Sequence, residues 1–351
     1  MLTTIINNSI MTTLFTKPYH YQKQGAAFVE RSNGRALICD SMGLGKTLQA
    51  LLWIHRNPKA RPIVVVCPAS VKWQWDEESK KHIGLRSQVL SGQKPPKQWR
   101  AERSALAPML IINWDILHYW TRWLRGLKPK LVIGDEIHFV ASVSSIRSRA
   151  WQELVFGHSE KNPDRPEKIP YQVPHVIELS GTPMVNRRIE MFVPLHTCRP
   201  DLFPNYYQFG HRFCGAKKND FGVWEFKGTS ENQRFRKLLS RVMVRRLKED
   251  VIDQLPPKIR TVIPVEVADR KEYDHASTNF MTWVREHRPG APSSKDERAE
   301  GLSRLSLLLS LVGKLKLPHV LDWIDEHHEE NPGAKLLTFA VHTKVIDRLR
   351  K

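Results

Sequence analysis

A glycine loop that ends in a lysine and a threonine lies between an apolar run and a helical pattern, in the stretch DSMGLGKTLQALLWI at residues 40–54. Backbone N–H groups of such a loop and of the following helix form an anion site, so this order predicts a bound phosphate. We expect Lys46 to reach the β- and γ-phosphates of a nucleotide and Thr47 to bind Mg²⁺. Asp40 stands where the pattern G-x-x-x-x-G-K-[ST] has its first glycine. The remaining match favours a phosphate site over an ordinary glycine turn.

Two carboxylates, Asp135 and Glu136, follow the apolar run LVIG. Acidic residues at the end of a strand are common, but a phosphate loop about ninety residues upstream favours a role in nucleotide hydrolysis. Asp135 is then expected to bind Mg²⁺, and Glu136 to orient or deprotonate the water that attacks the γ-phosphate. Together with Lys46, these two residues are the predicted catalytic set.

The composition indicates a polyanionic partner, because the 351 residues carry a formal net charge of +19. Nucleic acid is the first interpretation and an anionic membrane surface the second. The chain is long enough for two domains, and its hydrophobic content of 41% supports a core. We expect no signal peptide, because the N-terminal stretch MLTTIINNSI has no basic region and two Asn break its apolar run. We expect no membrane span, because the longest Leu-rich run, LSLLLSLV at residues 305–312, is too short.

Four cysteines form no C-x-x-C pair, which predicts reduced thiols in an intracellular protein. They are Cys39, Cys67, Cys198 and Cys214. We therefore expect the protein in the cytoplasm or at the nucleoid if it is encoded by a bacterium or phage, and in the nucleus if its host is eukaryotic.

Five apolar runs alternate with helical patterns between about residues 17 and 185. They are RALICD, PIVVVCP, MLIINW, KLVIGDE and HVIELSGT. Apolar strands that alternate with helices predict an α/β fold, in which helices cover both faces of a parallel sheet. Ligands of such sheets bind at the carboxyl ends of the strands, where the phosphate loop and Asp135 fall.

Seven segments, in this order along the chain, resemble the motifs of the SWI/SNF-type ATPases of helicase superfamily two. They are YHYQKQGAAFV, DSMGLGKT, VVVCPASVKWQWDEE, IINWDIL, DEIH, LSGTPMVNRRIE and VMVRRLKEDVIDQLPPK. The resemblance covers about residues 17–351 and includes the aspartate in place of the first loop glycine. The stretch LFPNYYQFGHRFCGAKKNDFGVWEFKGTSENQRFRKLL further resembles the SMARCA-like annealing-helicase subgroup, which rewinds DNA and remodels forks.

The resemblance implies a RecA-like P-loop NTPase lobe with helical insertions, followed by the start of a second RecA-like lobe. It implies a DNA-dependent ATPase that uses ATP and Mg²⁺ and translocates on double-stranded or branched DNA without unwinding it. Gln22 would read the adenine base, and His138 would help to couple the nucleotide state to lobe motion. The other implied ATP-binding residues are Met42, Gly43, Leu44, Gly45, Lys46, Thr47 and Leu48. The other coupling residues are Ser180, Gly181 and Thr182, and the DNA-binding residues are Pro68, Ala69, Ser70, Lys72 and Asn113.

The chain is expected to divide into five parts. They are an N-terminal leader at 1–16, lobe 1 at 17–185, a helical insertion at 186–260, a helical linker at 261–331 and the start of lobe 2 at 332–351. Residues 288–299 are expected to form an exposed loop, and the last part to form a turn, a strand and a helix. We expect a monomer, and the sequence does not identify a protein partner.

Two departures from the family pattern bear on function. Ala141 and Ser142 stand where the family usually carries Lys-Asn. The family's arginine fingers lie further into lobe 2 than Lys351, so we expect weak hydrolysis by this chain alone. An ATP- and DNA-binding fragment with little turnover is therefore one alternative, and an RNA helicase is another.

Two smaller features leave alternatives open. Trp73 and Trp75 either flank and stack on DNA, or one of them belongs to the core. The basic run RRLK, which begins with Arg245 and Arg246, either binds phosphate or pairs with the two carboxylates that follow it. Ion pairs are slightly favoured for this run.

Overall fold

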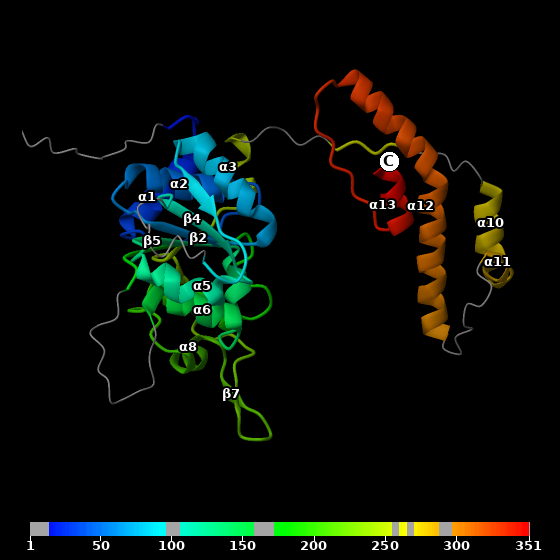
Figure 1. Ribbon diagram of the computed structural model, residues 1–351. Helices are drawn as coiled ribbons and strands as arrows, with labels where there is room; N and C mark the ends of the chain where they lie inside the picture. The colour runs from blue at the N-terminus through cyan, green and yellow to red at the C-terminus, as the bar shows by residue number, and fades with distance from the viewer. Residues whose placement is uncertain are drawn as a thin grey trace, which may run out of the picture. The chain divides into compact units, whose positions relative to one another are not determined.

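The computed structural model describes residues 14–95, 106–157, 172–254, 260–264, 270–287 and 297–350. The chain forms two compact units, residues 1–257 and residues 258–351. Every strand of the described residues belongs to the first unit, and the described secondary structure of the second unit is helical (Figure 1). The chemistry predicted from the sequence therefore lies on the first unit.

The first unit is built on a seven-stranded sheet in the order β3-β4-β2-β5-β6-β1-β9, with all neighbours parallel. The strands are β1 (Arg35–Ile38), β2 (Ile63–Cys67), β3 (Ser87–Val89), β4 (Met109–Asn113), β5 (Leu131–Asp135), β6 (His175–Leu179) and β9 (Met243–Val244). Five of them occupy the five predicted apolar runs, so the expected α/β class with a parallel sheet is confirmed. Strands as short as β3 and β9 leave no recognisable pattern and were not predicted.

The central strands are apolar on both faces. β2 is buried along its whole length and pairs with β4 from Ile63 opposite Met109 to Cys67 opposite Asn113. A strand with two apolar faces is stable only between two layers of helices. The sequence of β2 therefore requires the helical layers that the structure has on each side of the sheet.

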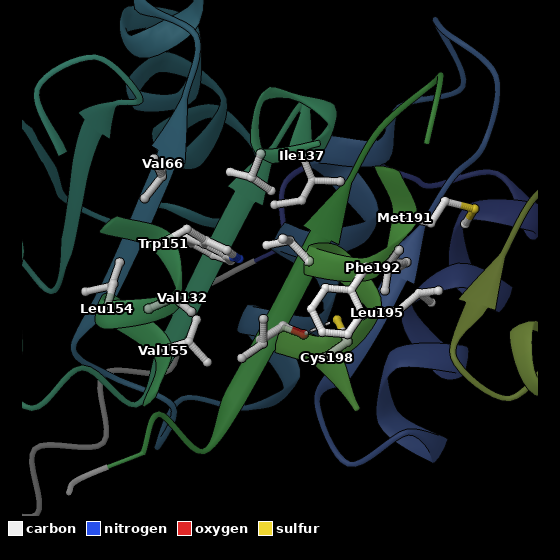
Figure 2. Close-up of a cluster of buried hydrophobic side chains, with 14 of the residues drawn as sticks. Val66, Val132, Ile137, Trp151, Leu154, Val155, Met191, Phe192, Leu195 and Cys198 are labelled. Carbon is white, nitrogen blue, oxygen red and sulfur yellow. Dashed lines mark hydrogen bonds between the residues drawn. The ribbon is translucent and has the colours of Figure 1, made fainter. Parts of the chain in front are cut away.

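Each face of the sheet packs against its own set of helices. One buried cluster joins the sheet to α1 (His20–Arg31), α2 (Lys46–Arg56) and α3 (Lys72–Ile83). The other joins it to α5 (Leu117–Gly126), α6 (Ile146–Phe156) and α7 (Phe192–Cys198). Figure 2 shows part of this second cluster, with Trp151 of α6 and Phe192 of α7 among the valines of β2 and β5. Because the cores lie on both faces, the carboxyl edge of the sheet stays available for a ligand.

Residues 186–254 add mainly short helices to the first unit. After the 3₁₀ helix η4 (Arg188–Met191) and α7 come α8 (Tyr206–Phe213), a hairpin of β7 (Lys217–Lys218) and β8 (Trp224–Glu225), α9 (Asn232–Leu239), β9 and the 3₁₀ helix η5 (Glu249–Gln254). β9 returns to the main sheet, with Leu37 opposite Met243 and Ile38 opposite Val244. The segment predicted as a helical insertion thus contributes a strand beside β1, the strand that leads into the phosphate loop.

The second unit consists of α10 (Arg270–Thr278), α11 (Phe280–His287), α12 (Glu297–Glu330) and α13 (Thr343–Leu349) in its described residues. The prediction of a strand near the end of the chain is wrong, because residues 334–340 form no strand. Leu337 and Phe339 there are 76% and 85% exposed. A strand needs a neighbouring strand for its backbone groups, and the described part of this unit has none.

Some predictions fall partly outside the described residues. This applies to the leader at 1–16, of which only 14–16 are described, and to the loop at 288–299, of which the last three residues begin α12. All four cysteines are buried and unbridged. Among the helices that the structure describes, none combines the length and the apolar character needed to cross a membrane.

Candidate nucleotide site

The predicted phosphate loop connects β1 to α2. Gly45 is the N-cap of α2 with φ 66° and ψ 49°, and Gly43 has φ 83°, so both lie in the left-handed region that favours glycine. A Cβ atom at Gly45 would lie 2.5 Å from Gln22 Nε2, so another residue there would have to displace the end of the Gln22 side chain as well as adopt a positive φ. The loop therefore brings backbone N–H groups to the start of a helix, as a phosphate site requires.

Three strand ends meet at this loop. Lys46 Nζ donates a hydrogen bond to the main-chain oxygen of Asp40 at 3.2 Å, just after β1. A Cβ atom on Gly181, after β6, would lie 3.6 Å from the same Nζ. Burial raises the pKa of Asp135, at the end of β5, and the positive charge of Lys46 is close enough to oppose part of that rise. The structure thus gathers Lys46 and Asp135 at one edge of the sheet.

Asp135 is held at both carboxylate oxygens and at its main chain. Its Oδ2 accepts from Trp75 Nε1 at 2.8 Å, its Oδ1 accepts from the Glu136 N–H at 3.0 Å, and its main-chain oxygen accepts from Trp114 Nε1 at 2.9 Å. The pKa of Asp135 is raised to about 6. Burial is the largest cause, the Trp75 indole donor opposes the rise, and the charge of Glu136 adds to it. A nearby cation would favour the ionised carboxylate.

The side chains at this edge of the sheet are suitable ligands for a Mg²⁺ ion that binds together with a nucleotide. Thr47 and Asp135 offer a hydroxyl and a carboxylate, which are the hard oxygen ligands that Mg²⁺ prefers. Among the described residues no group of three His, Cys, Asp or Glu side chains could hold a metal by itself. Mg²⁺ in nucleotide sites takes its other ligands from phosphates and water, so two protein ligands are the expected number.

Glu136, His138 and Ser180 form a contiguous polar group beside Asp135. His138 Nδ1 lies 3.1 Å from Glu136 Oε2 and 3.2 Å from Ser180 Oγ, and the Thr182 N–H donates to Ser180 Oγ at 3.1 Å. Glu136 has a positive φ of 51°, which is strained for a residue other than glycine. Of the predicted coupling residues, His138 contacts Glu136 directly, and Ser180 and Thr182 are connected to it through His138.

Gln22, the predicted adenine contact, and three other predicted ATP-binding residues differ in exposure. Gln22 is only 5% exposed; its Oε1 accepts from the Tyr19 N–H and its Nε2 lies 3.4 Å from the main-chain oxygen of Leu44. Leu44 and Leu48 are buried in apolar clusters, so only their backbone can face a nucleotide. Met42 is exposed.

The basic run after β9 does not form the ion pairs predicted for it. The Arg246 guanidinium instead pairs with Asp40, 3.0 Å away, and also donates to Gln49 and to the Tyr21 carbonyl. Arg245 Nη1 donates to the main-chain oxygens of Cys39 and Gly181 at 3.1 and 3.2 Å. The pairing of β9 with β1 carries both arginines to the base of the phosphate loop and away from the acidic residues beyond them.

The Asp40–Arg246 pair is expected to stabilise the first unit strongly, because Asp40 is completely buried and the Arg246 side chain is 13% exposed. Arg246→Ala should lower the free energy of unfolding by about 3–5 kcal/mol, since it leaves a buried carboxylate unpaired. Urea unfolding measures this change. Arg147→Ala, which removes the exposed Arg147–Asp115 pair, should cost less than about 1 kcal/mol. Equal losses in the two variants would contradict the assignment.

The predicted DNA-binding residues follow β2 and β4 at the same edge of the sheet. Pro68 precedes the 3₁₀ helix η1 (Ala69–Val71), in which Ala69 and Ser70 are exposed. Lys72 Nζ donates to the Leu90 carbonyl, and Asn113 is 7% exposed. Ala69 and Ser70 of η1 are therefore the most accessible residues of this predicted contact.

The tryptophan pair that follows η1 divides between surface and core. Trp73 is 65% exposed, whereas Trp75 is 1% exposed and donates to Asp135. Nothing in the sequence indicated that Trp75 or Trp114 contacts Asp135, the predicted catalytic aspartate.

The chain matches the model of the SNF2-related domain over residues 21–288. A Xenopus tropicalis relative, SWI/SNF-related matrix-associated actin-dependent regulator of chromatin subfamily A-like protein 1, is 30% identical over 335 residues, which cover 94% of this chain and 32% of that protein. The human DNA annealing helicase and endonuclease ZRANB3 is 29% identical over 336 residues, which cover 93% and 29%. The chain thus spans about a third of the length of these relatives.

A solved structure, the Sulfolobus solfataricus SWI2/SNF2 ATPase core in complex with dsDNA, matches with a TM-score of 0.54 and 20% identity. The match covers 97% of this chain and 70% of that chain. It confirms the RecA-like fold that the sequence motifs implied. Because the family model spans most of its length, the chain belongs to the SNF2-related domain family.

Proposed function

We propose that this chain binds Mg-ATP and duplex DNA as part of a DNA-dependent ATPase that translocates on double-stranded DNA. The observation that carries the proposal is the convergence of Lys46, Asp135 and Glu136 at the carboxyl edge of the sheet, beside a glycine loop in left-handed geometry. Family membership agrees with it. No finding favours the RNA-helicase alternative.

In the proposed reaction the chain contributes position and charge. Lys46 would lie against the β- and γ-phosphates, and Thr47 and Asp135 would hold Mg²⁺, which neutralises phosphate charge when bound. Glu136 would orient the attacking water and accept its proton. His138 contacts both Glu136 and Ser180. It would therefore couple the position of Glu136, the proposed general base, to the position of the segment after β6.

Relatives described as annealing helicases support branched or fork-like DNA as the substrate class. We propose that the chain acts as a monomer on such DNA, in the nucleus of a eukaryotic host or at the nucleoid of a bacterial one. We further propose that turnover by these 351 residues alone is slow, because one RecA-like unit builds only one wall of the nucleotide site.

The test is to measure Mg-ATP binding, duplex binding and phosphate release by the purified chain. We expect binding of Mg-ATP, tighter binding of duplex DNA than of duplex RNA of the same length, and slow phosphate release. Failure to bind Mg-ATP, or a preference for RNA, would refute the proposed function. Release of several phosphates per second with strong stimulation by DNA would refute only its slow-turnover part.

DNA binding is expected to depend steeply on salt and little on sequence, because backbone phosphates would be contacted by a chain with a net charge of +19. A footprint of about 5 phosphates gives a slope of log affinity against log salt concentration of roughly −4 to −5. A fluorescence-anisotropy titration over a salt series measures this slope. A slope near zero would mean that the basic surface does not bind DNA.

A further inference from the structure

Two indole rings converge on Asp135 from opposite faces of the sheet. Trp75 belongs to the buried cluster beneath α1, α2 and α3, and its Nε1 donates to the Asp135 carboxylate at 2.8 Å. Trp114 belongs to the cluster beneath α5 and α6, and its Nε1 donates to the Asp135 main-chain oxygen at 2.9 Å. Both tryptophans are 1% exposed, so the two donors are buried, whereas Asp135 itself is of intermediate exposure. One residue is thereby held through its side chain from one core and through its backbone from the other.

Each indole stands next to a segment with a proposed DNA contact. Trp75 lies in the first turn of α3, whose start adjoins the exposed residues of η1. Trp114 directly follows Asn113 at the end of β4, and its main-chain N–H donates to the Cys67 carbonyl at the end of β2. A displacement of either segment would therefore move a donor of Asp135.

Burial alone does not explain the contact of Trp75. Trp53 belongs to the same cluster and is 2% exposed, yet its Nε1 has no hydrogen-bond partner among the described residues. This face of the sheet thus tolerates a buried indole with an unused donor. The direction of Trp75 Nε1 toward a carboxylate is a specific feature of the site, and hydrogen bonds to charged groups are stronger than those to neutral ones.

We propose that Trp75 and Trp114 are positioning residues that link DNA contact at η1 and at the end of β4 to the placement of Asp135. The inference rests on the proposed function, since it requires that both DNA and Mg-ATP bind. Groups that orient a metal ligand typically change metal affinity or activity 10–100-fold when removed. Any such link is reciprocal, so DNA that favours the productive position of Asp135 must tighten Mg-nucleotide binding.

The experiment compares the wild-type chain with Trp75→Phe, Trp114→Phe and the control Trp53→Phe. Each change keeps an aromatic ring and removes one indole N–H, and only the control removes an N–H without a partner. The affinity for a non-hydrolysable ATP analogue is measured as a function of Mg²⁺ concentration, with and without a saturating short DNA duplex. The affinity for that duplex alone and the melting temperature are measured in parallel.

For the wild-type chain and for Trp53→Phe we expect the duplex to tighten Mg-nucleotide binding by about tenfold, within the usual range of coupling between sites. In Trp75→Phe and Trp114→Phe this tightening should be lost, and the Mg²⁺ concentration for half-maximal binding should rise about 10-fold or more. Their affinity for the duplex alone should stay within about twofold of wild type, which distinguishes lost positioning from a lost DNA site.

Three results would overturn the inference. The first is a wild-type chain that binds both ligands without any effect of one on the other, which leaves the proposed function standing. The second is wild-type coupling and a wild-type Mg²⁺ requirement in both Trp75→Phe and Trp114→Phe. The third is a wild-type chain that binds neither ligand, which refutes the proposed function as well. If one of the two variants fails to fold, the other decides the matter alone.

Discussion

Lys46→Ala is expected to abolish ATP turnover and to weaken ATP binding, while the affinity for duplex DNA stays close to that of the wild-type chain. The reason is the position of Lys46 as the first residue of α2, with Nζ directed to the edge where β1, β5 and β6 end. A lysine in this place neutralises the β- and γ-phosphates, and alanine leaves their charge without a partner. The proposed DNA contacts follow β2 and β4, so the same change should leave them intact.

Equilibrium titration with a labelled nucleotide and a phosphate-release assay measure the two effects of Lys46→Ala. Lys59→Ala serves as the matched control, because Lys59 is exposed in the loop after α2 and lies apart from the phosphate loop in the sequence. The control should keep wild-type nucleotide affinity. If Lys46→Ala bound ATP as tightly as the wild-type chain, the phosphate-loop assignment would be wrong.

Glu136→Gln is expected to lower the rate of ATP hydrolysis by about 10²–10⁴, the usual contribution of a general base. Glutamine keeps the size of the side chain but accepts no proton from the attacking water. ATP and Mg²⁺ should still bind, because Asp135 and Thr47 are unchanged. Glu136 Oε2 lies 3.1 Å from His138 Nδ1, so the substitution also changes a contact with one of the proposed coupling residues.

Single-turnover phosphate release, together with nucleotide binding at equilibrium, separates the loss of hydrolysis in Glu136→Gln from a loss of binding. Glu329→Gln in α12 is the isosteric control, since Glu329 is exposed and belongs to the second unit. Hydrolysis in Glu136→Gln within about threefold of the wild-type rate would rule out the role as general base, because such a small change is below the expected range.

The features that the sequence determined are those encoded by neighbouring residues. The five apolar runs became β1, β2, β4, β5 and β6, because a strand that is apolar on both faces has one stable environment, the inside of a parallel sheet. The glycines of the phosphate loop and the acidic end of β5 were visible for the same reason. The position of these glycines and acidic residues directly after apolar runs is enough to place them at strand ends.

The predicted strand near the C-terminus shows the limit of such local patterns. Residues 334–340 include the apolar run LLTFA, yet in the structure they form no strand. Pairing depends on a neighbouring strand that no local pattern can supply. For the same reason the two-residue strand β9 was missed, although it pairs with β1 and extends the sheet.

Tertiary structure alone decided the partners of the buried charges. Glu178 stands in the apolar run HVIEL, and complete burial raises its pKa to about 8, although Trp151 and Thr197 donate to it. Arg246 reaches Asp40 across 206 positions, whereas the sequence favoured its nearest acidic neighbours. Ion-pair partners are set by which side chains are buried together, and burial is a property of the packed fold rather than of spacing.

The contacts of Asp135 have the same origin. The sequence determined that a carboxylate ends β5, but two indoles from separate cores reach it only because α3 folds over one face of the sheet and β4 ends at the same edge. The hydrogen-bond acceptor of a buried indole N–H depends on which groups the tertiary structure packs against it. The residues adjacent to a tryptophan in the sequence therefore do not identify that acceptor. The sequence therefore determined the residue types proposed for catalysis, and the packing of both faces of the sheet decided the orientation of Asp135.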